Sequence, residues 1–460
     1  MNNVIADQAG GIQGAAAAGL GWRRHVPAGI VAAAFAGLSW RQLQFVSSHS
    51  VNILFWDQWD FFKPLFENQG WWATFARQHG PHREGAGLVV MRLLAGMSDW
   101  DSRWDAFAAS LLMIAAAALG LRLARRMGIP GNSVALVAVP LLFLNVLQYE
   151  SFVGAVNLSH GTMPMFLFMA YCLSWFARNE RWRILAISAL TFLLIFTGFG
   201  LFVGFLTPVI LVAECIQSWR ARDTMRATLS GLGVAASGAS WALFSHGYLF
   251  QPAVAGFRFP FERPAQYFVF VARMLGNFFG APILGALGLV LGLLVAAALV
   301  VICVRNGRRM IRAGVASEPG SVVLFCLSAY SLLFCGNAAV GRVFMGDTAP
   351  FASRYVTLMV PAGMALFLEI ALLGRRRPFG WPALVYAALL IPGTCFLRPL
   401  DVTGVQWYTE GKAKWKAAYL ETHDEAKADK AAGFQVYPGP LGDRLKYLEE
   451  RRLNLFAPPD

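Results

Sequence analysis

Long uncharged apolar runs recur along this chain from residue 26 to residue 397, and short clusters of arginine separate them. A run of about 20 apolar residues has the length of a helix that crosses a bilayer. Apolar residues make up 57% of the chain and charged residues 14%, whereas soluble globular proteins have about 45–50% and about 25%. The pattern predicts an all-α polytopic membrane protein rather than a set of soluble domains.

The runs predict about eleven transmembrane helices. The run 184–217 is too long for one crossing, and the break at residues 197–200 predicts two helices joined by a tight outer turn. The predicted spans are 26–45, 104–121, 131–148, 162–177, two within 184–217, 227–246, 281–304, 320–338, 355–373 and 381–397.

These spans divide the chain into three parts. Residues 1–25 form an N-terminal segment, 26–397 the transmembrane bundle, and 398–460 a small α-rich tail with expected helices at 407–432 and 441–455. Within the bundle, a long first outer loop covers 47–103 and a second outer segment covers 247–280. The short apolar run in 84–99 has the length of an interfacial helix.

The net charge is +13, and the distribution of the basic residues along the chain predicts the orientation of the bundle. Arginine clusters alternate with nearly neutral connections, which is the pattern of cytoplasmic and outer loops. The N-terminus is therefore expected inside and the tail outside. Topology accounts for the basic residues, so no nucleic-acid partner is predicted. The six cysteines fall in or beside apolar runs without metal-binding spacing.

Two acids follow the first span directly, in the stretch Trp56-Asp57-Gln58-Trp59-Asp60. Asp57 and Asp60 are three residues apart, so they share a face on a helical turn. Aromatic neighbours at the membrane surface would hold a carboxylate in a partly dry setting that suits a general base, alone or with a metal ion. An aromatic belt with two solvated acids remains the alternative.

Further along the same loop, the stretch 78–84 reads QHGPHRE. Two histidines lack the HExxH frame of a helical zinc site. His82, Arg83 and Glu84 instead predict a phosphate-facing cluster, because the arginine fork matches phosphate oxygens. Pairing of Arg83 with Glu84 or Asp60 inside the loop stays open as the structural alternative.

A third polar cluster lies between the ninth and tenth predicted spans, where Arg342, Arg354 and Tyr355 occur. Both arginines are expected outside, against the topology trend, and an anionic lipid headgroup would use such residues. Snorkelling of the side chains to the interface is the alternative. Asn157 and His160, outside the fourth span, are weaker candidates.

Together these motifs resemble bacterial integral-membrane glycosyltransferases of the GT-C type: the acids after span 1, the HRE motif in the same loop, and the later G-R and S-R-Y motifs. The Val436-Tyr437-Pro438 stretch of the tail is also similar. The resemblance implies a sugar donor on a polyprenyl-phosphate carrier, a glycan or lipid acceptor of the cell envelope, and an inverting reaction at the outer face of the bacterial inner membrane.

By this resemblance Asp57 matches the catalytic acid first and Asp60 second, and the need for a divalent metal is left open. His82, Arg83, Glu84, Arg342, Arg354 and Tyr355 are the expected substrate-binding residues. A lipid-linked saccharide transporter or flippase, a polysaccharide polymerase or ligase, and a non-catalytic scaffold are the competing interpretations. The sequence names neither the sugar nor the acceptor.

Overall fold

The computed structural model describes residues 26–251, 255–279, 281–374 and 380–458 of the chain. The predicted N-terminal segment 1–25 and the arginine cluster 375–377 lie outside the described residues. Helices make up most of the described chain, and two strands of two residues each form one hairpin. The all-α prediction is confirmed.

The helices and strands follow one another along the chain with short connections. They are α2 (Val26–His49), α3 (Gln58–Phe61), α4 (Lys63–Phe66), α5 (Trp71–Phe75), β1 (Gln78–His79), β2 (His82–Arg83), α6 (Gly85–Met97), α7 (Arg103–Arg126), η1 (Val134–Val137), α8 (Ala138–Phe143), η2 (Val146–Gln148), α9 (Glu150–Val153), α10 (Thr162–Ser174), α11 (Glu180–Ile195), η3 (Gly198–Gly200), α12 (Leu201–Arg220) and α13 (Thr224–Ser245).

The second half contains α14 (Ala265–Gly276), η4 (Asn277–Phe279), α15 (Ala281–Leu284), α16 (Ala286–Ala313), α17 (Pro319–Arg342), η5 (Val343–Met345), η6 (Ala349–Phe351), α18 (Ser353–Gly374), α19 (Trp381–Cys395), α20 (Pro399–Thr422), α21 (Glu425–Ala432), α22 (Gly442–Glu450) and η7 (Asn454–Phe456).

The prediction of eleven spans is wrong. Among the described residues, six helices are long and apolar enough to cross a membrane, or seven if α19 and α20, which meet at a bend of 43°, form one broken span. The six are Arg103–Arg126, Gly198–Arg220, Thr224–Ser245, Ala286–Ala313, Pro319–Met345 and Ser353–Gly374.

Interruptions in the apolar runs explain part of the difference, whereas α2 is continuous over 24 residues but is not among the six. The predicted span 131–148 is η1, α8 and η2 in succession, because Asn145 ends the helical path and caps η2 by accepting from the backbone NH of Leu147. Helix α10 has 13 residues, about 20 Å at 1.5 Å per residue, shorter than a bilayer core of about 30 Å. These short helices are mostly buried in the bundle.

Other local predictions hold. The run 184–217 is divided into α11 and α12 at Thr197, and a short helix, α6, forms in the first loop where one was predicted. The expected tail helix 407–432 is wrong, because His423 takes a left-handed conformation and Asp424 caps a new helix, α21. The predicted tail helix 441–455 corresponds to α22 followed by η7.

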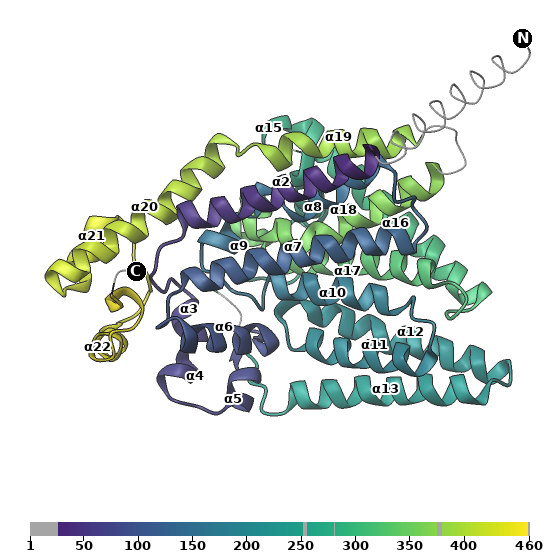
Figure 1. The fold of residues 1–460 in the computed structure, drawn as a ribbon, viewed down its shortest axis with the longest axis horizontal. Coiled ribbons are helices and arrows are strands. Elements are labelled where there is room, and N and C mark those ends of the chain that lie inside the picture. Colours follow the sequence, from purple (N-terminus) through teal and green to yellow (C-terminus); the bar gives the residue numbers. More distant parts are fainter. Residues whose placement is uncertain (1–25, 252–254, 280, 375–379, 459–460) are drawn as a thin grey trace, which may run out of the picture.

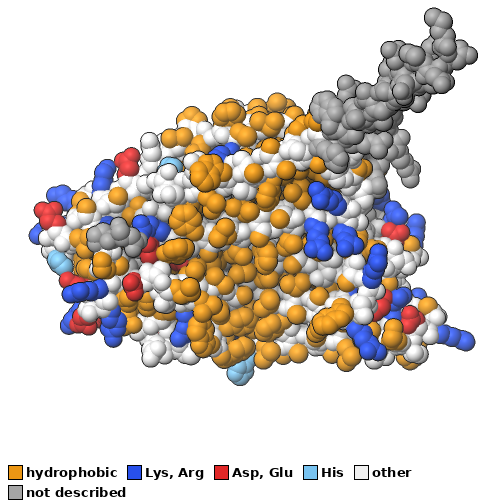
Figure 2. All heavy atoms as spheres, viewed as in Figure 1, with side chains coloured by type: hydrophobic (Ala, Val, Ile, Leu, Met, Phe, Trp, Pro, Cys, Tyr) orange, Lys and Arg blue, Asp and Glu red, His pale blue; other side chains and the backbone are white. Residues whose placement is uncertain are grey.

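Apolar and charged side chains separate along the long axis of the molecule. Figure 1 shows the long helices running roughly along this axis, with α3–α6 and α20–α22 together at one end. On the face in Figure 2, apolar side chains cover the middle, and charged side chains gather towards the two ends. Such an apolar band is what a membrane protein presents to lipid.

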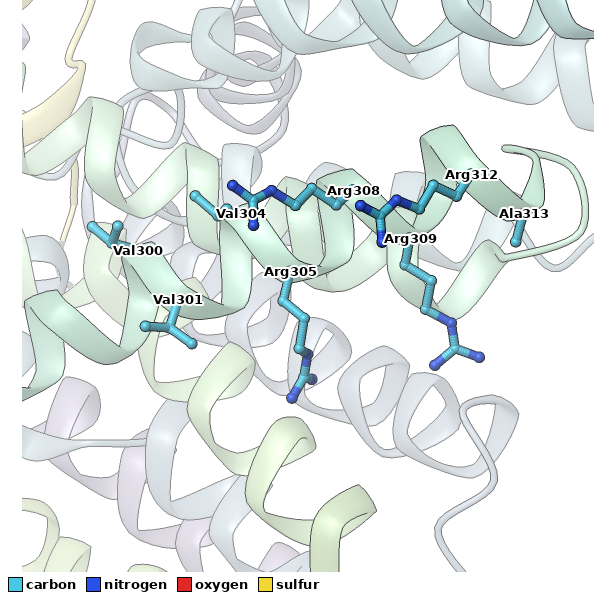
Figure 3. A pocket seen from close by; sticks show the side chains of 8 residues that line it. All are labelled: Val300, Val301, Val304, Arg305, Arg308, Arg309, Arg312 and Ala313. Carbon is cyan, nitrogen blue, oxygen red and sulfur yellow. The ribbon is translucent and has the colours of Figure 1, made fainter.

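Ion pairs hold helix ends together at the end opposite α3–α6. Arg183 of α11 pairs with Glu214 of α12, which is buried, and Arg309 of α16 lies 2.9 Å from Glu318 before α17. Figure 3 shows four arginines on the last turns of α16, lining a hollow. Arg305, one of them, bonds to Glu369 of α18. These contacts bring several of the predicted cytoplasmic clusters to one end.

Candidate functional site

The candidate site begins with the hairpin of the first loop, which carries two histidines. Strands β1 and β2 pair antiparallel with His79 opposite His82. Gly80 in the turn has a φ of +54°, a left-handed conformation that glycine adopts without steric cost. The hairpin thereby fixes His79 and His82 on adjacent strands beside the start of α6.

Three glycines let the surrounding segments approach the hairpin closely. A Cβ at Gly87 would lie 2.1 Å from the Ser159 Oγ, and one at Gly85 would lie 2.3 Å from the Phe196 carbonyl oxygen. At Gly198 it would lie 2.7 Å from the His160 ring. Only a residue without a side chain fits there. Helix α6, the 154–161 loop and η3 therefore meet at one point.

Asp57 lies at the surface of this meeting point. It precedes α3 in helical conformation, but its carboxylate caps no backbone NH. The side chain is 52% exposed, and its Oδ1 lies 3.8 Å from the Nε2 of His79. Trp56 before it has a φ of +51° and donates its NH to the Val436 carbonyl at 2.7 Å. The carboxylate is thus held in place by the backbone while remaining accessible.

Asp60 lies on the same turn and faces other partners. Its Oδ1 accepts a hydrogen bond from the Tyr437 hydroxyl at 2.9 Å and lies 3.6 Å from the Arg444 guanidinium. Arg444 also donates to the Trp59 carbonyl at 3.0 Å. Asp60 therefore joins the first loop to the tail. The two acids do not converge on one target, and Asp57 is the better placed base.

Behind Asp57, imidazole rings and a buried carboxylate form a cluster. The His160 Nε2 lies 3.1 Å from the Glu84 Oε1, and Glu84 is fully buried. The His160 ring centre is 5.2 Å from that of His82 and 6.3 Å from that of His79. Phe61 and Phe199 flank the rings. We refer to His79, His82, Glu84 and His160 as the histidine cluster.

Burial and neighbouring charges shift the pKa values of His82, Glu84 and His160 in different directions. Burial lowers the pKa of His160, but Glu84 and Asp57 overcome this and raise it above its usual value. Burial raises the pKa of Glu84, yet His160 and His79 bring it below the ordinary carboxyl value. For His82, burial and the neighbouring His160 lower the pKa well below that of a free imidazole. These shifts favour an imidazolium–carboxylate pair of His160 and Glu84 beside an uncharged His82.

Arg83 does not join the cluster. It is 5% exposed, and its guanidinium donates to three backbone carbonyls: Phe244 at 2.8 Å, His246 at 2.6 Å, and Ala76. These bonds join the hairpin to the end of α13. The expected phosphate role is unsupported by this geometry, because the donors are used within the protein; neither Glu84 nor Asp60 is the partner.

Two arginines of the connection between α17 and α18 flank Tyr355. The guanidinium carbons of Arg342, at the end of α17, and Arg354, at the start of α18, each lie 5.8 Å from the centre of the Tyr355 ring. The positive charge of Arg342 also lowers the pKa of both His82 and His160. Arg342 therefore interacts both with the ring of Tyr355 and, through its charge, with the histidine cluster.

Glu150 of α9 supports the Arg354 side of the site. Its carboxylate accepts from the Arg354 backbone NH at 2.9 Å and from the Tyr408 hydroxyl at 3.0 Å, while its own NH donates to the Ser353 hydroxyl at 3.0 Å. Tyr408 belongs to α20. The tail therefore contacts both sides of the site, through Asp60 and through Glu150.

The arrangement offers an accessible carboxylate, a histidine–carboxylate pair and two arginines. Among the described residues, no group of three or more histidine, cysteine or acidic side chains is arranged to hold a metal ion. Sequence reasoning ranked His160 low because its partner Glu84 is 76 positions away. Its position two residues before α10, and three residues after the polar Asn157, was the available signal.

No family model matches the chain, and no curated protein or solved structure is significantly similar to it.

Proposed function

We propose that the protein is a membrane glycosyltransferase that moves a sugar from a polyprenyl-phosphate carrier to a glycan or lipid acceptor of the cell envelope. The observation that carries the proposal is the position of Asp57. Its carboxylate is accessible and contacts an imidazole, and its charge acts on His160, as does that of Arg342. A base and a cation near one point are the two groups that transfer from a lipid phosphate needs.

The proposed reaction is one displacement at the anomeric carbon. The acceptor oxygen forms a bond to that carbon while its proton passes to the Asp57 carboxylate. The bond between the carbon and the phosphate oxygen breaks, and its electron pair stays on the phosphate. Attack from the face opposite the leaving group inverts the anomeric centre. Arg342 and Arg354 stabilise the departing phosphate, since guanidinium groups match its oxygens.

The apolar surface supports a lipid-linked donor. Long helices with exposed apolar side chains, such as Leu293 and Leu294 of α16, give the bundle its band of apolar surface. A polyprenyl tail would remain in the bilayer while its phosphate reaches the end of the bundle that carries Asp57. We place this end outside the cytoplasm in the bacterial inner membrane, because the arginine clusters of the opposite helix ends follow the positive-inside pattern.

A transfer assay tests the proposal against its rivals. Purified protein in lipid vesicles receives polyprenyl-phosphoryl sugars with a labelled sugar, together with envelope glycans and glycolipids as acceptors. We expect label to leave the carrier and polyprenyl phosphate to form. Movement of the intact lipid-linked sugar between leaflets, without cleavage, would instead identify a flippase. Absence of both would leave the enzyme proposal without support.

A further inference from the structure

We propose that His160, held by Glu84, is the centre of an anion-binding site that receives the phosphate of the lipid donor. This inference rests on the proposed function and adds a role for His160 and a role for Glu84. His160 would touch the phosphate directly, and Glu84 would position and charge the imidazole without touching the ligand.

The two ring nitrogens of His160 have different surroundings. Its Nε2 faces the Glu84 carboxylate at 3.1 Å. Its backbone NH lies 3.2 Å from the Asn157 Oδ1, which fixes the loop. The Nδ1 makes no hydrogen bond with the described part of the chain, and the side chain is 24% exposed. When the ring is protonated and its Nε2 faces Glu84, the Nδ1 carries an NH that can donate to a ligand.

The surroundings of His160 favour an anion at that NH. Arg342 is near enough for its charge to lower the pKa of the ring, and two cations beside each other are stabilised when an anion lies between them. Neither oxygen of Glu84 has a well-directed hydrogen bond from the described residues, although the carboxylate is fully buried. Such a carboxylate stays charged in a dry position only if a cation faces it.

His82 completes one wall of the site. Its Nδ1 is buried and has no hydrogen-bond partner among the described residues, and its ring lies 5.2 Å from that of His160. The lowered pKa of His82 favours its uncharged form, which can donate one hydrogen bond to a phosphate oxygen without adding a further positive charge. Asp57 is on the His79 side of His160.

The charged groups around His160 fix the expected pH dependence. Glu84 at the start of α6 and Asp57 before α3 favour the imidazolium, whereas Arg342 at the end of α17 opposes it. His79 and His82 are the hairpin's titratable groups beside it. The balance raises the pKa of His160, so the ring is cationic below that pKa. Anion binding should be strong there and weaken as pH rises through it.

The test uses a ligand whose own charge does not change. Farnesyl methyl phosphate is a diester that keeps one negative charge between pH 5.5 and 9, unlike a phosphate monoester, whose second pKa is about 6. Farnesol serves as the uncharged control. Binding to the full chain in lipid nanodiscs is measured across the pH range for wild type, His160→Gln, Glu84→Gln and Glu449→Gln. The last variant breaks the His423–Glu449 contact of 3.5 Å in the tail, a matched pair far from the site in sequence.

In wild type, affinity for the diester should fall about tenfold as pH rises through the His160 pKa, the value of one hydrogen bond to a charged group. Glu84→Gln should move this fall to lower pH, and His160→Gln should abolish it; Glu449→Gln should leave it unchanged. Melting curves identify any variant that fails to fold, and the wild-type profile remains decisive in that case. A flat wild-type profile, or the same midpoint in Glu84→Gln, would overturn the inference.

The two proposals fail in different ways. If wild type binds the diester with the expected pH profile and transfers no sugar, the anion site stands and the glycosyltransferase proposal fails. If sugar is transferred but binding ignores His160 and Glu84, the enzyme proposal stands and the anion site lies elsewhere, with Arg342 and Arg354 alone as the cations.

Discussion

At the scale of single residues, the contrast between Asp57 and Asp60 decides the candidate site. The two carboxylates lie three residues apart at the start of α3, but only Asp60 accepts a hydrogen bond from another side chain, that of Tyr437. The Asp57 carboxylate has an imidazole at 3.8 Å and is 52% exposed. A spacing of three residues predicts a shared face, but the sequence does not tell which segment of the tail will approach that face. Asp60 meets Tyr437 across 377 positions.

Substituting the two acids should separate catalysis from structure. Asp57→Asn keeps the shape of the side chain and removes the base, so transfer should slow by roughly 10²–10⁴-fold with an unchanged melting temperature. Asp60→Asn should lower the melting temperature and reduce transfer less. Initial rates and thermal unfolding of the purified variants measure both effects. Equal loss of activity in the two variants would contradict the separate roles.

The histidine cluster predicts how stability depends on pH. His82 has a lowered pKa, so below about pH 6.5 the unfolded chain binds a proton that the folded protein does not, and stability falls as pH decreases. Glu84 also has a lowered pKa and loses its contribution at still lower pH. His160 has a raised pKa, and its contribution is lost as pH rises through that value.

His82→Gln tests the acid side of this dependence. The variant lacks the titrating imidazole, so its melting temperature should decrease less than that of wild type between about pH 6.5 and 5. Thermal unfolding in detergent at closely spaced pH values gives the slopes. Replacement of the exposed His423, which contacts only Glu449 at 3.5 Å among the described acids, is the control. Parallel slopes in wild type and His82→Gln would contradict the buried neutral imidazole.

At the scale of elements, the sequence predicts helices more reliably than their lengths. Apolar runs located α7, α12, α13, α16, α17 and α18, because each is both continuous and uncharged enough to cross a membrane. The run 131–148 failed as a span because short helices and a capping asparagine interrupt it. Periodicity within an apolar run does not reveal such breaks, since every face of a buried helix is apolar.

The hairpin shows a similar limit for the site. The residue types in QHGPHRE indicated polar chemistry, but not which side chain points outward. The side chains of His82 and Arg83 lie on opposite faces of β2 because successive residues of a strand alternate. Arg83 donates to the carbonyls of Phe244 and His246 at the end of α13. Those carbonyls are more than 160 positions away. Only the packing of the hairpin against α13 assigns Arg83 to structure.

Arg83→Lys tests this structural role. A single ammonium cannot replace a fork that donates to three carbonyls, so stability should fall by at least about 2 kcal/mol, while the affinity for the lipid donor stays near that of wild type. Arg258→Lys is a matched control, because Arg258 forms an exposed pair with Glu262 that should contribute little. Unchanged stability with weakened donor binding in Arg83→Lys would restore the phosphate role.

At the scale of the whole molecule, the two ends of the bundle differ in chemistry. One end has arginines paired with Glu214, Glu318 and Glu369, and the other has the first loop, the histidine cluster and the tail (Figure 1). The positive-inside pattern predicts that the first of these ends lies in the cytoplasm. If this predicted orientation is correct, the proposed polyprenyl-phosphate donor must be in the outer leaflet.

Accessibility labelling tests the orientation. Cysteines placed singly at Lys430 in α21 and at Arg312 in α16 are treated with a membrane-impermeant thiol reagent in intact cells, in a chain without its six native cysteines. We expect labelling at 430 and protection at 312. Arg376, another predicted cytoplasmic position, lies outside the described residues. The reverse pattern would place Asp57 in the cytoplasm and remove the outer-leaflet donor from the account.

The most direct test measures both sugar transfer and the face of the membrane on which it takes place. Sealed vesicles carry the protein in the orientation found by labelling, with a labelled polyprenyl-phosphoryl sugar in both leaflets and an impermeant acceptor added only on the face of Asp57. If Asp57 is the base, label should pass to this acceptor in wild type, and Asp57→Asn should reduce the rate of transfer by roughly 10²–10⁴-fold. Transfer only when the acceptor is on the side of Arg312, or an equal rate in Asp57→Asn, would contradict this proposal.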